Sequence, residues 1–147
     1  MRIGENGLSL IKHYEGCKLK SYLCPAGVWT IGYGHTGMVM KGMEITQEQA
    51  VDMLKGDIAR FESNINSLKL DLSQHQFDAL VCIIFNIGFG NFKTSTLLKR
   101  VASCDTPENI KEAFMMWVKA KGITLSGLVK RRTSEAELFN TGKVILK

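Results

Sequence analysis

Three side chains near the start of the chain have the types and the spacing needed to cut a glycosidic bond. Eight residues separate Glu15 from Cys24, and five separate Cys24 from Thr30. A carboxylic acid can protonate a leaving oxygen, an anion can stabilise positive charge on a sugar, and a hydroxyl can hold a water molecule. A glycine-rich segment, residues 31–37, follows directly. The pattern favours glycoside cleavage, with a thiol at a position where such sites usually carry a second carboxylate.

The surrounding periodicity predicts how these side chains are positioned. A helix is predicted over residues 5–14, with Leu8 and Ile11 on one face, and Glu15 one turn further along that face. Gly16 is expected to end this helix. Residues 18–40 are rich in strand-forming side chains, and the turn at residues 25–27 predicts a small antiparallel sheet. Glu15 is therefore expected to point toward the surface on which Leu8 and Ile11 pack.

The rest of the chain reads as helical. Capping boxes predict a long helix from Thr46 and an apolar, central helix from Ser73, and later helices are predicted near 96–102, from Pro107, and over 128–140. This order predicts an α+β fold in one domain, residues 1–147, with two lobes and a cleft between them. The small lobe is expected at about 15–45, the connecting helix at about 46–69, and the helical lobe at about 70–147, with the helix at 5–14 packed on it.

Composition narrows the class of protein. The chain has 147 residues, 45% of them hydrophobic, which excludes a disordered chain. No apolar run is long enough to span a bilayer, and the first residues lack the apolar stretch of a secretory signal. We therefore expect no stable membrane insertion, and we expect the chain to stay where it is made until something else releases it.

Positive charge is concentrated late in the sequence. The net charge is +5, and the late basic residues are Lys119, Lys121, Lys130, Arg131 and Arg132. Two interpretations remain open, an anionic partner that is met faster by electrostatic attraction and a solvated helix face. Nucleic acid is disfavoured because no exposed aromatic residues interleave with these cations and no recognition motif is present.

The four cysteines do not have the spacing of a metal site, so we expect no metal and no cofactor. Cys82 is expected to be a buried thiol and Cys104 a turn residue. Cys17 and Cys24 flank the first predicted strand. A disulfide between them is possible only if their Cα atoms come within about 7 Å, in which case oxidation would block Cys24. The alternative, favoured for a cytoplasmic protein, is that both stay reduced.

Three motifs together resemble the phage-type lysozymes, the endolysins of glycoside hydrolase family 24. They are the Glu15–Cys24–Thr30 spacing, the segment 30–36, and residues 127–132 with Glu135. The resemblance covers about residues 5–140. It implies a lysozyme-like α+β fold and a muramidase that hydrolyses the β-1,4 bond between N-acetylmuramic acid and N-acetylglucosamine in bacterial peptidoglycan for host cell lysis. It also implies a monomer kept in the bacterial host cytoplasm until a holin-type partner releases it to the cell wall.

The resemblance assigns roles to the first site residues. Glu15 matches the general acid, and a carboxyl at the buried end of a helix holds its proton more tightly. Cys24 stands where the family commonly has aspartate, and it is the variety with cysteine that this chain resembles. The thiolate has three possible roles, as a base, a nucleophile or an electrostatic partner. Thr30 matches the residue that holds the attacking water, although a strand threonine bonded to a neighbour would look the same.

Other residues are matched as support or as substrate contacts. By resemblance, His35 pairs with Asp57, and Arg131 forms an ion pair with the catalytic glutamate, which would oppose the effect of burial on that carboxyl. The backbone at Gly32 and Gly34 could approach a sugar closely. Matched positions on the far side of the cleft are Phe85, Asn86 and Ser95.

Other functions remain possible from the sequence. The chain could be a non-catalytic peptidoglycan-binding module in which Cys24 has disabled the chemistry. It could also be a lytic transglycosylase, which needs only the acid. A membrane-disrupting cationic segment at 119–132 is disfavoured because Gly122, Ser126 and Gly127 would interrupt an amphipathic helix.

Overall fold

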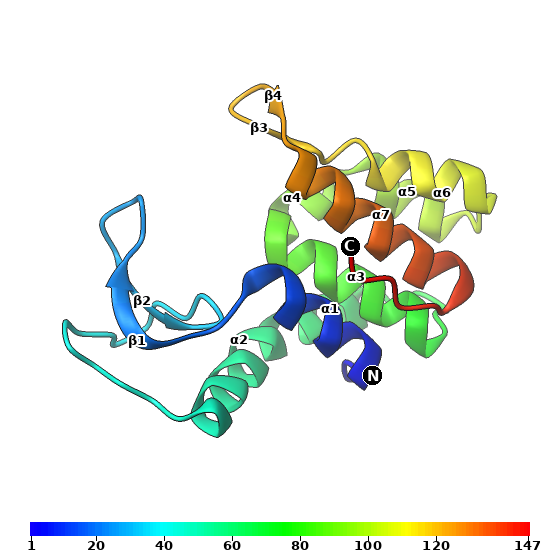
Figure 1. Ribbon diagram of the computed structural model, residues 1–147. Coiled ribbons are helices and arrows are strands. Elements are labelled where there is room, and N and C mark those ends of the chain that lie inside the picture. The colour runs from blue at the N-terminus through cyan, green and yellow to red at the C-terminus, as the bar shows by residue number, and fades with distance from the viewer.

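Seven helices and two small hairpins form two lobes, as Figure 1 shows for the computed structural model of residues 1–147. The small lobe contains β1 (Lys18–Leu23) and β2 (Trp29–Gly32), and α2 (Gln47–Ser67) leads from it to the helical lobe. The remaining elements form the helical lobe: α1 (Glu5–Glu15), α3 (Gln74–Ile87), α4 (Phe89–Lys93), α5 (Thr96–Ala102), α6 (Pro107–Phe114), β3 (Lys119–Ala120), β4 (Ile123–Thr124) and α7 (Ser126–Thr141). The predicted α+β, two-lobed fold is confirmed.

Both predicted capping boxes are present. The Thr46 hydroxyl accepts the Gln49 amide at 3.1 Å, and the Gln49 side chain accepts the Thr46 amide at 2.9 Å. Ser73 and Gln76 make the same reciprocal pair at 3.3 and 3.0 Å. These bonds satisfy amides that a helix start leaves without partners, so α2 and α3 begin where the sequence predicted.

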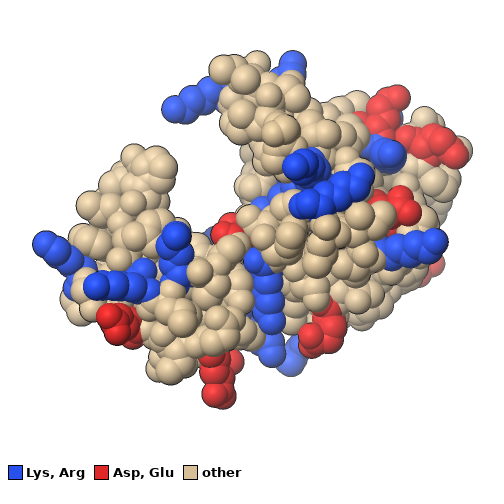
Figure 2. Space-filling view, in the orientation of Figure 1, with Lys and Arg blue, Asp and Glu red and all other residues tan.

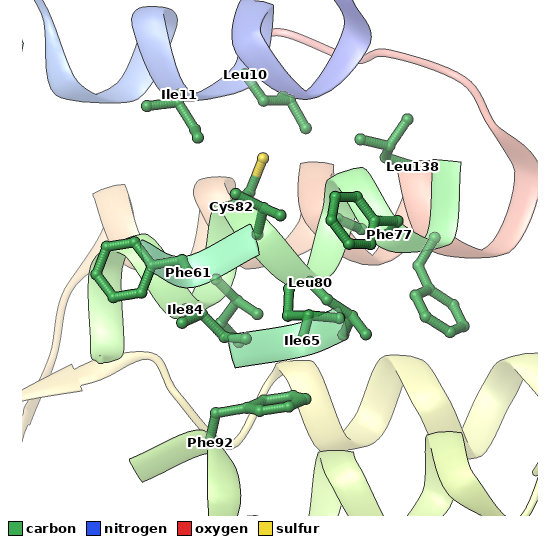
Figure 3. Packing of buried hydrophobic residues seen from close by; sticks show 14 of the residues in the cluster. Leu10, Ile11, Phe61, Ile65, Phe77, Leu80, Cys82, Ile84, Phe92 and Leu138 are labelled. Carbon is green, nitrogen blue, oxygen red and sulfur yellow. The ribbon is translucent and has the colours of Figure 1, made fainter. Parts of the chain in front are cut away.

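Helix α3 is the centre of the hydrophobic core, as its apolar sequence predicted. Figure 3 shows its side chains between those of α1, α2 and α7. Cys82, on α3, is buried, and its thiol donates to the Gly7 carbonyl at 3.4 Å. Burial raises the pKa of this thiol well above its usual value, so Cys82 is the buried structural cysteine that was expected.

Helix α1 is held by α3 at its N-terminal end. Gly4, which precedes α1, provides no side-chain cap. The Asp78 carboxylate of α3 replaces it, accepting the Gly4 amide at 2.8 Å and the Gly7 amide at 3.3 Å. Gly7 lies so close to α3 that a Cβ there would be 2.8 Å from the Asp78 Cβ. This close approach fixes the position of α1, and therefore of Glu15, on the helical lobe.

The small sheet is antiparallel, with Tyr22 opposite Thr30 and Leu23 opposite Trp29. The following segment returns along β1, where the Ser21 amide donates to the Met43 carbonyl at 2.8 Å. Trp29 and Thr30 are the first two residues of β2, which leads into the glycine-rich segment.

The hypothesis of a Cys17–Cys24 disulfide is wrong for this fold. The six residues of β1 lie between the two cysteines, and all four thiols are free. Because a strand rises by about 3.3 Å per residue, the two Cα atoms lie on the order of 20 Å apart, far beyond the reach of a disulfide. The Cys17 thiol instead faces the Gln47 side-chain oxygen, 3.7 Å away.

The late basic region contains a hairpin that the sequence did not predict, and the structure excludes one of the two interpretations of its positive charge. Residues 119–124 form a hairpin, with positive φ at Lys121 (52°) and Gly122 (78°), as a tight two-residue turn requires. Arg131 and Arg132 are not part of a solvated helix face, because they are 5% and 0% exposed. Helix α7 begins at Ser126, two residues earlier than predicted.

No helix has the combination of length and hydropathy that a transmembrane span requires. No group of three or more His, Cys, Asp or Glu side chains is arranged to hold a metal ion.

Replacing Gly7 by alanine should destabilise the protein by about 1–3 kcal/mol, because the added methyl must displace the Ile3 side chain and the Asp78 Cβ. Gly56→Ala is the matched control, since Gly56 lies inside α2 with open space at the Cβ position. It should stabilise by about 0.5–1 kcal/mol through helix propensity. Urea unfolding measures both changes, and equal effects of the two substitutions would contradict the close α1–α3 approach.

Candidate active site

Glu15 is the last residue of α1 and lies at the junction of the two lobes. Gly16 ends the helix with φ of 68°, and its amide donates to the Lys12 carbonyl at 3.1 Å. The Glu15 Oε2 accepts from Arg131 of α7 at 2.6 Å. Its Oε1 lies 3.7 Å from the position that a Cβ on Gly34 would occupy. One carboxylate oxygen thus faces the helical lobe and the other faces the glycine-rich segment of the small lobe.

Arg131 is a buried cation with several partners. Burial opposes its charge, but the attraction of Glu135 and Glu15 outweighs this effect and raises the pKa of the guanidinium above its usual value. Its Cζ lies 5.9 Å from the centre of the Tyr14 ring. The Tyr14 hydroxyl is itself 2.7 Å from the Ser134 hydroxyl. Arg131 is therefore a fixed positive charge beside Glu15, rather than a mobile surface side chain.

Cys24 is the first residue of the turn that joins β1 to β2. The turn is closed by the Gly27 amide donating to the Cys24 carbonyl at 2.8 Å and by the Cys24 amide donating to the Val28 carbonyl at 3.0 Å. The backbone N–H groups of Val28 and Ala26 lower the pKa of the half-buried Cys24 thiol, and the Thr30 hydroxyl acts in the same direction. Amides that point at a sulfur stabilise its thiolate, so this turn favours the ionised form.

Thr30 is 3% exposed, and its hydroxyl donates to the Val28 carbonyl at 3.0 Å. This bond is the structural role that the sequence left open for a strand threonine. The hydroxyl also lies close enough to lower the pKa of the Cys24 thiol. The structure therefore brings Thr30 and Cys24 together on the small lobe.

His35 and Asp57 meet as the resemblance implied. The His35 Nδ1 lies 2.9 Å from one carboxylate oxygen of Asp57, and its Nε2 lies 3.0 Å from the Gly37 carbonyl oxygen. Both ring nitrogens have partners, so His35 ties the glycine-rich segment to α2. This geometry suits support rather than proton transfer to a substrate.

The four residues predicted to contact sugar lie in different surroundings. Asn86 is exposed at the end of α3, while half-buried Phe85 packs against Phe61 with ring centres 5.9 Å apart. Ser95 is 5% exposed and caps α5, accepting the Leu98 amide at 3.1 Å. Gly32 is buried, and a Cβ there would face Ala50 of α2 at 3.5 Å. Gly34, rather than Gly32, is the exposed glycine beside Glu15.

A buried hydrogen-bond network around Arg132, which the sequence did not predict, lies behind Asn86. Arg132 donates to the Trp117 carbonyl at 2.9 Å and to side-chain oxygens of Asn86 and Glu135. A pocket of about 470 Å³ lies between this network and the β3–β4 hairpin, and Asn86, Trp117 and Arg132 are among its lining residues. The three-residue spacing of Arg132 and Glu135 on a helix was the available signal.

A cleft separates the lobes, and Figure 2 shows it as a hollow with acidic atoms at its floor and Lys and Arg side chains on both sides. The hollow opens between the small sheet and the β3–β4 hairpin (Figure 1). An extended polymer lying across this cleft would meet a carboxylate near the middle and positive charge at the rims.

Comparison with known proteins identifies the family. The sequence profile named "Phage lysozyme" matches residues 12–135. The chain belongs to the phage lysozyme family. It is 48% identical to an endolysin of Acyrthosiphon pisum secondary endosymbiont phage 1, over 96% of this chain and 99% of that one. It is 42% identical to an endolysin of Bacillus phage PZA over 97% of this chain, which spans just over half (56%) of that relative.

A solved structure agrees with these matches. The endolysin of Escherichia coli O157:H7 phage FAHEc1 superposes with a TM-score of 0.90 at 35% identity, and the match covers 99% of this chain and 97% of that one. This phage lysozyme is thus an enzyme of the muramidase type of glycosidase, with the lysozyme-like fold that its sequence predicted.

The turn around Cys24 generates a prediction about its titration. Because backbone amides lower the pKa of this thiol, alkylation by iodoacetamide should reach half its maximal rate at a lower pH in the folded protein than in urea. A Cys17→Ser/Cys104→Ser variant removes the two exposed thiols, and peptide mass spectrometry separates the Cys24 peptide from the Cys82 peptide, whose thiol also reacts in urea. Identical pH midpoints in the folded and unfolded protein would contradict the stabilised thiolate.

Proposed function

We propose that this phage lysozyme hydrolyses the β-1,4 bond between N-acetylmuramic acid and N-acetylglucosamine in bacterial peptidoglycan, for host cell lysis. The observation that carries the proposal is the position of Glu15 between the lobes, with one oxygen on Arg131 and the other toward Gly34. The half-buried Glu15 side chain extends from the end of α1, where Gly16 ends the helix, and the close packing of Gly7 against α3 fixes the other end of that helix.

The residues divide the reaction between the two lobes. Glu15, when protonated, donates its proton to the glycosidic oxygen as the bond to the anomeric carbon breaks. Positive charge then develops on the sugar ring, and the Cys24 thiolate is the nearby anion that the small lobe supplies. A water held by the Thr30 hydroxyl attacks the anomeric carbon, and its proton passes to the thiolate. The products are two shorter chains, one with a new reducing end.

The Cys24 surroundings favour this role over a disabled site. A thiol in ordinary surroundings is only a few per cent ionised at pH 7. The amides of the β1–β2 turn raise that fraction by lowering the pKa of the thiol. The turn thereby gives cysteine the negative charge that aspartate would carry without assistance.

The partners follow from the substrate. Phage endolysins act on the cell wall, and we propose that this one stays in the host cytoplasm as a monomer until a holin-type protein opens the membrane. Its net charge of +5 favours encounter with anionic wall polymers.

Replacing Glu15 by glutamine should lower the rate of hydrolysis of purified peptidoglycan by at least about 100-fold, because the amide has no proton to donate at neutral pH. Cys24→Ser should also lose most activity, whereas Cys24→Asp should stay within about tenfold of the unmodified enzyme, since it restores an anion. Release of reducing ends, with mass spectrometry of the products, measures the rates. Reducing-end N-acetylmuramic acid is the expected product.

The controls are an exposed carboxylate and an exposed thiol away from the cleft, Glu48→Gln and Cys104→Ser, which should keep full activity. A 1,6-anhydro product would contradict hydrolysis and would show that the enzyme is a lytic transglycosylase. Binding to peptidoglycan without release of any product, followed by a gain of activity in Cys24→Asp, would show a wall-binding module instead.

A further inference from the structure

A buried carboxylate lies behind the candidate acid and has no part in the proposed reaction. Glu135 of α7 is 0% exposed, and its Oε2 accepts from the Arg131 Nε at 3.3 Å. Its Oε1 accepts from the Arg132 Nη1. Burial raises the pKa of this carboxyl, although both arginines act in the opposite direction. An apolar side chain would fill this space without that desolvation, so the carboxylate serves its two arginines rather than the packing.

The two arginines connect Glu135 to opposite parts of the cleft wall. Arg131 continues to Glu15 at 2.6 Å and to the Cys82 carbonyl at 3.3 Å. Arg132 continues to the exposed Asn86 and to a backbone carbonyl in the loop after α6. One unbroken chain of charged hydrogen bonds therefore joins the end of α1 to the end of α3 through α7.

We propose that Glu135 is a positioning residue for hydrolysis: it holds Arg131 against Glu15, holds Arg132 against Asn86, and balances the positive charge that Glu15 faces. The proposal rests on the proposed role of Glu15 as the general acid. Glu135 lies behind the arginines and touches no substrate, so it acts only through them.

The charge balance makes the role measurable. This hydrogen-bond network contains two carboxylates and two guanidinium groups, and their formal charges cancel. The other titratable groups that face it are Tyr14 of α1 and, from α3, Cys82 and Asp78. Burial keeps the Cys82 thiol neutral, and the Asp78 carboxylate is bonded to the Gly4 and Gly7 amides. None of these groups replaces the charge of Glu135.

The Glu135→Gln variant tests this role, because it keeps the size of the side chain and removes its charge. The uncompensated positive charge then favours the ionised form of Glu15, so the acid loses its proton at lower pH. The alkaline limb of the kcat/KM profile should move by about one pH unit toward acid, and activity at neutral pH should fall about tenfold. Glu137→Gln, on the same helix but away from the arginines, should leave the limb in place.

A second change separates charge from folding. Arg132→Met combined with Glu135→Gln restores neutrality, so the alkaline limb should return while KM rises, because Asn86 has lost its partner. Glu135→Asp keeps the charge and should keep the limb. Circular dichroism and thermal unfolding establish which variants are folded at the assay temperature. If Glu135→Gln does not fold, the proposal still requires that the double variant and Glu135→Asp have the same alkaline limb as the unmodified enzyme.

An unmoved limb in folded Glu135→Gln overturns the proposal and leaves Glu135 as a purely structural residue. So does an equal shift in a Glu15→Gln background, because the effect would then not pass through Glu15. Failure of the proposed function looks different, since Glu15→Gln alone would then keep full activity.

Discussion

The ion pair between Glu15 and Arg131 is the contact on which the arrangement of this enzyme depends. It joins the first and last helices of the chain across 116 residues of sequence, at 2.6 Å. The arginine is nearly inaccessible to solvent while the carboxylate is 22% exposed at the cleft. Because a charge this well buried has to be balanced, α1 and α7 are held in one relative position. The Glu15 carboxylate therefore lies at the surface of the cleft, and Arg131 holds it from the side of the helical lobe.

The two lobes are stabilised by different kinds of interaction. In the helical lobe, hydrophobic packing around α3 and the Asp78 cap hold α1 so close to α3 that no methyl group fits at Gly7. The small lobe has little core of its own, and it relies on hydrogen bonds within the sheet and on the His35–Asp57 contact with α2. The electrostatic effect at Cys24 is local to this lobe, since a single turn places amides at the thiol and so favours the thiolate.

Local patterns allowed most elements to be predicted. The capping boxes at Thr46 and Ser73 involve residues three apart, so their hydrogen bonds can be predicted from the local sequence. The short helix α4 and the β3–β4 hairpin were not predicted, because no comparable local signal marks them. Lys121 takes a positive φ that local preference gives more often to Asn or Asp, so its turn carried no clear signal.

The late arginines show what the charge pattern of a sequence cannot decide. The charge pattern of Lys130, Arg131 and Arg132 left a solvated face open, because cations are seldom buried, and only the resemblance to the family paired Arg131 with Glu15. Burial became possible only because Glu15, Glu135 and Asn86 arrive from α1, α7 and α3 with matching oxygens. Likewise the cysteine spacing allowed a disulfide until the extended path of β1 separated Cys17 from Cys24.

The sequence by itself determined the order of the elements, the caps and apolar faces of the main helices, and the residue types available for chemistry, because these depend on neighbours a few positions apart. Only the tertiary structure decided which charges are buried, which glycine faces the acid, and which side chains stand behind it. Those properties depend on contacts between residues far apart in the chain, and burial in such contacts changes the free energy of a charge more than any local preference does.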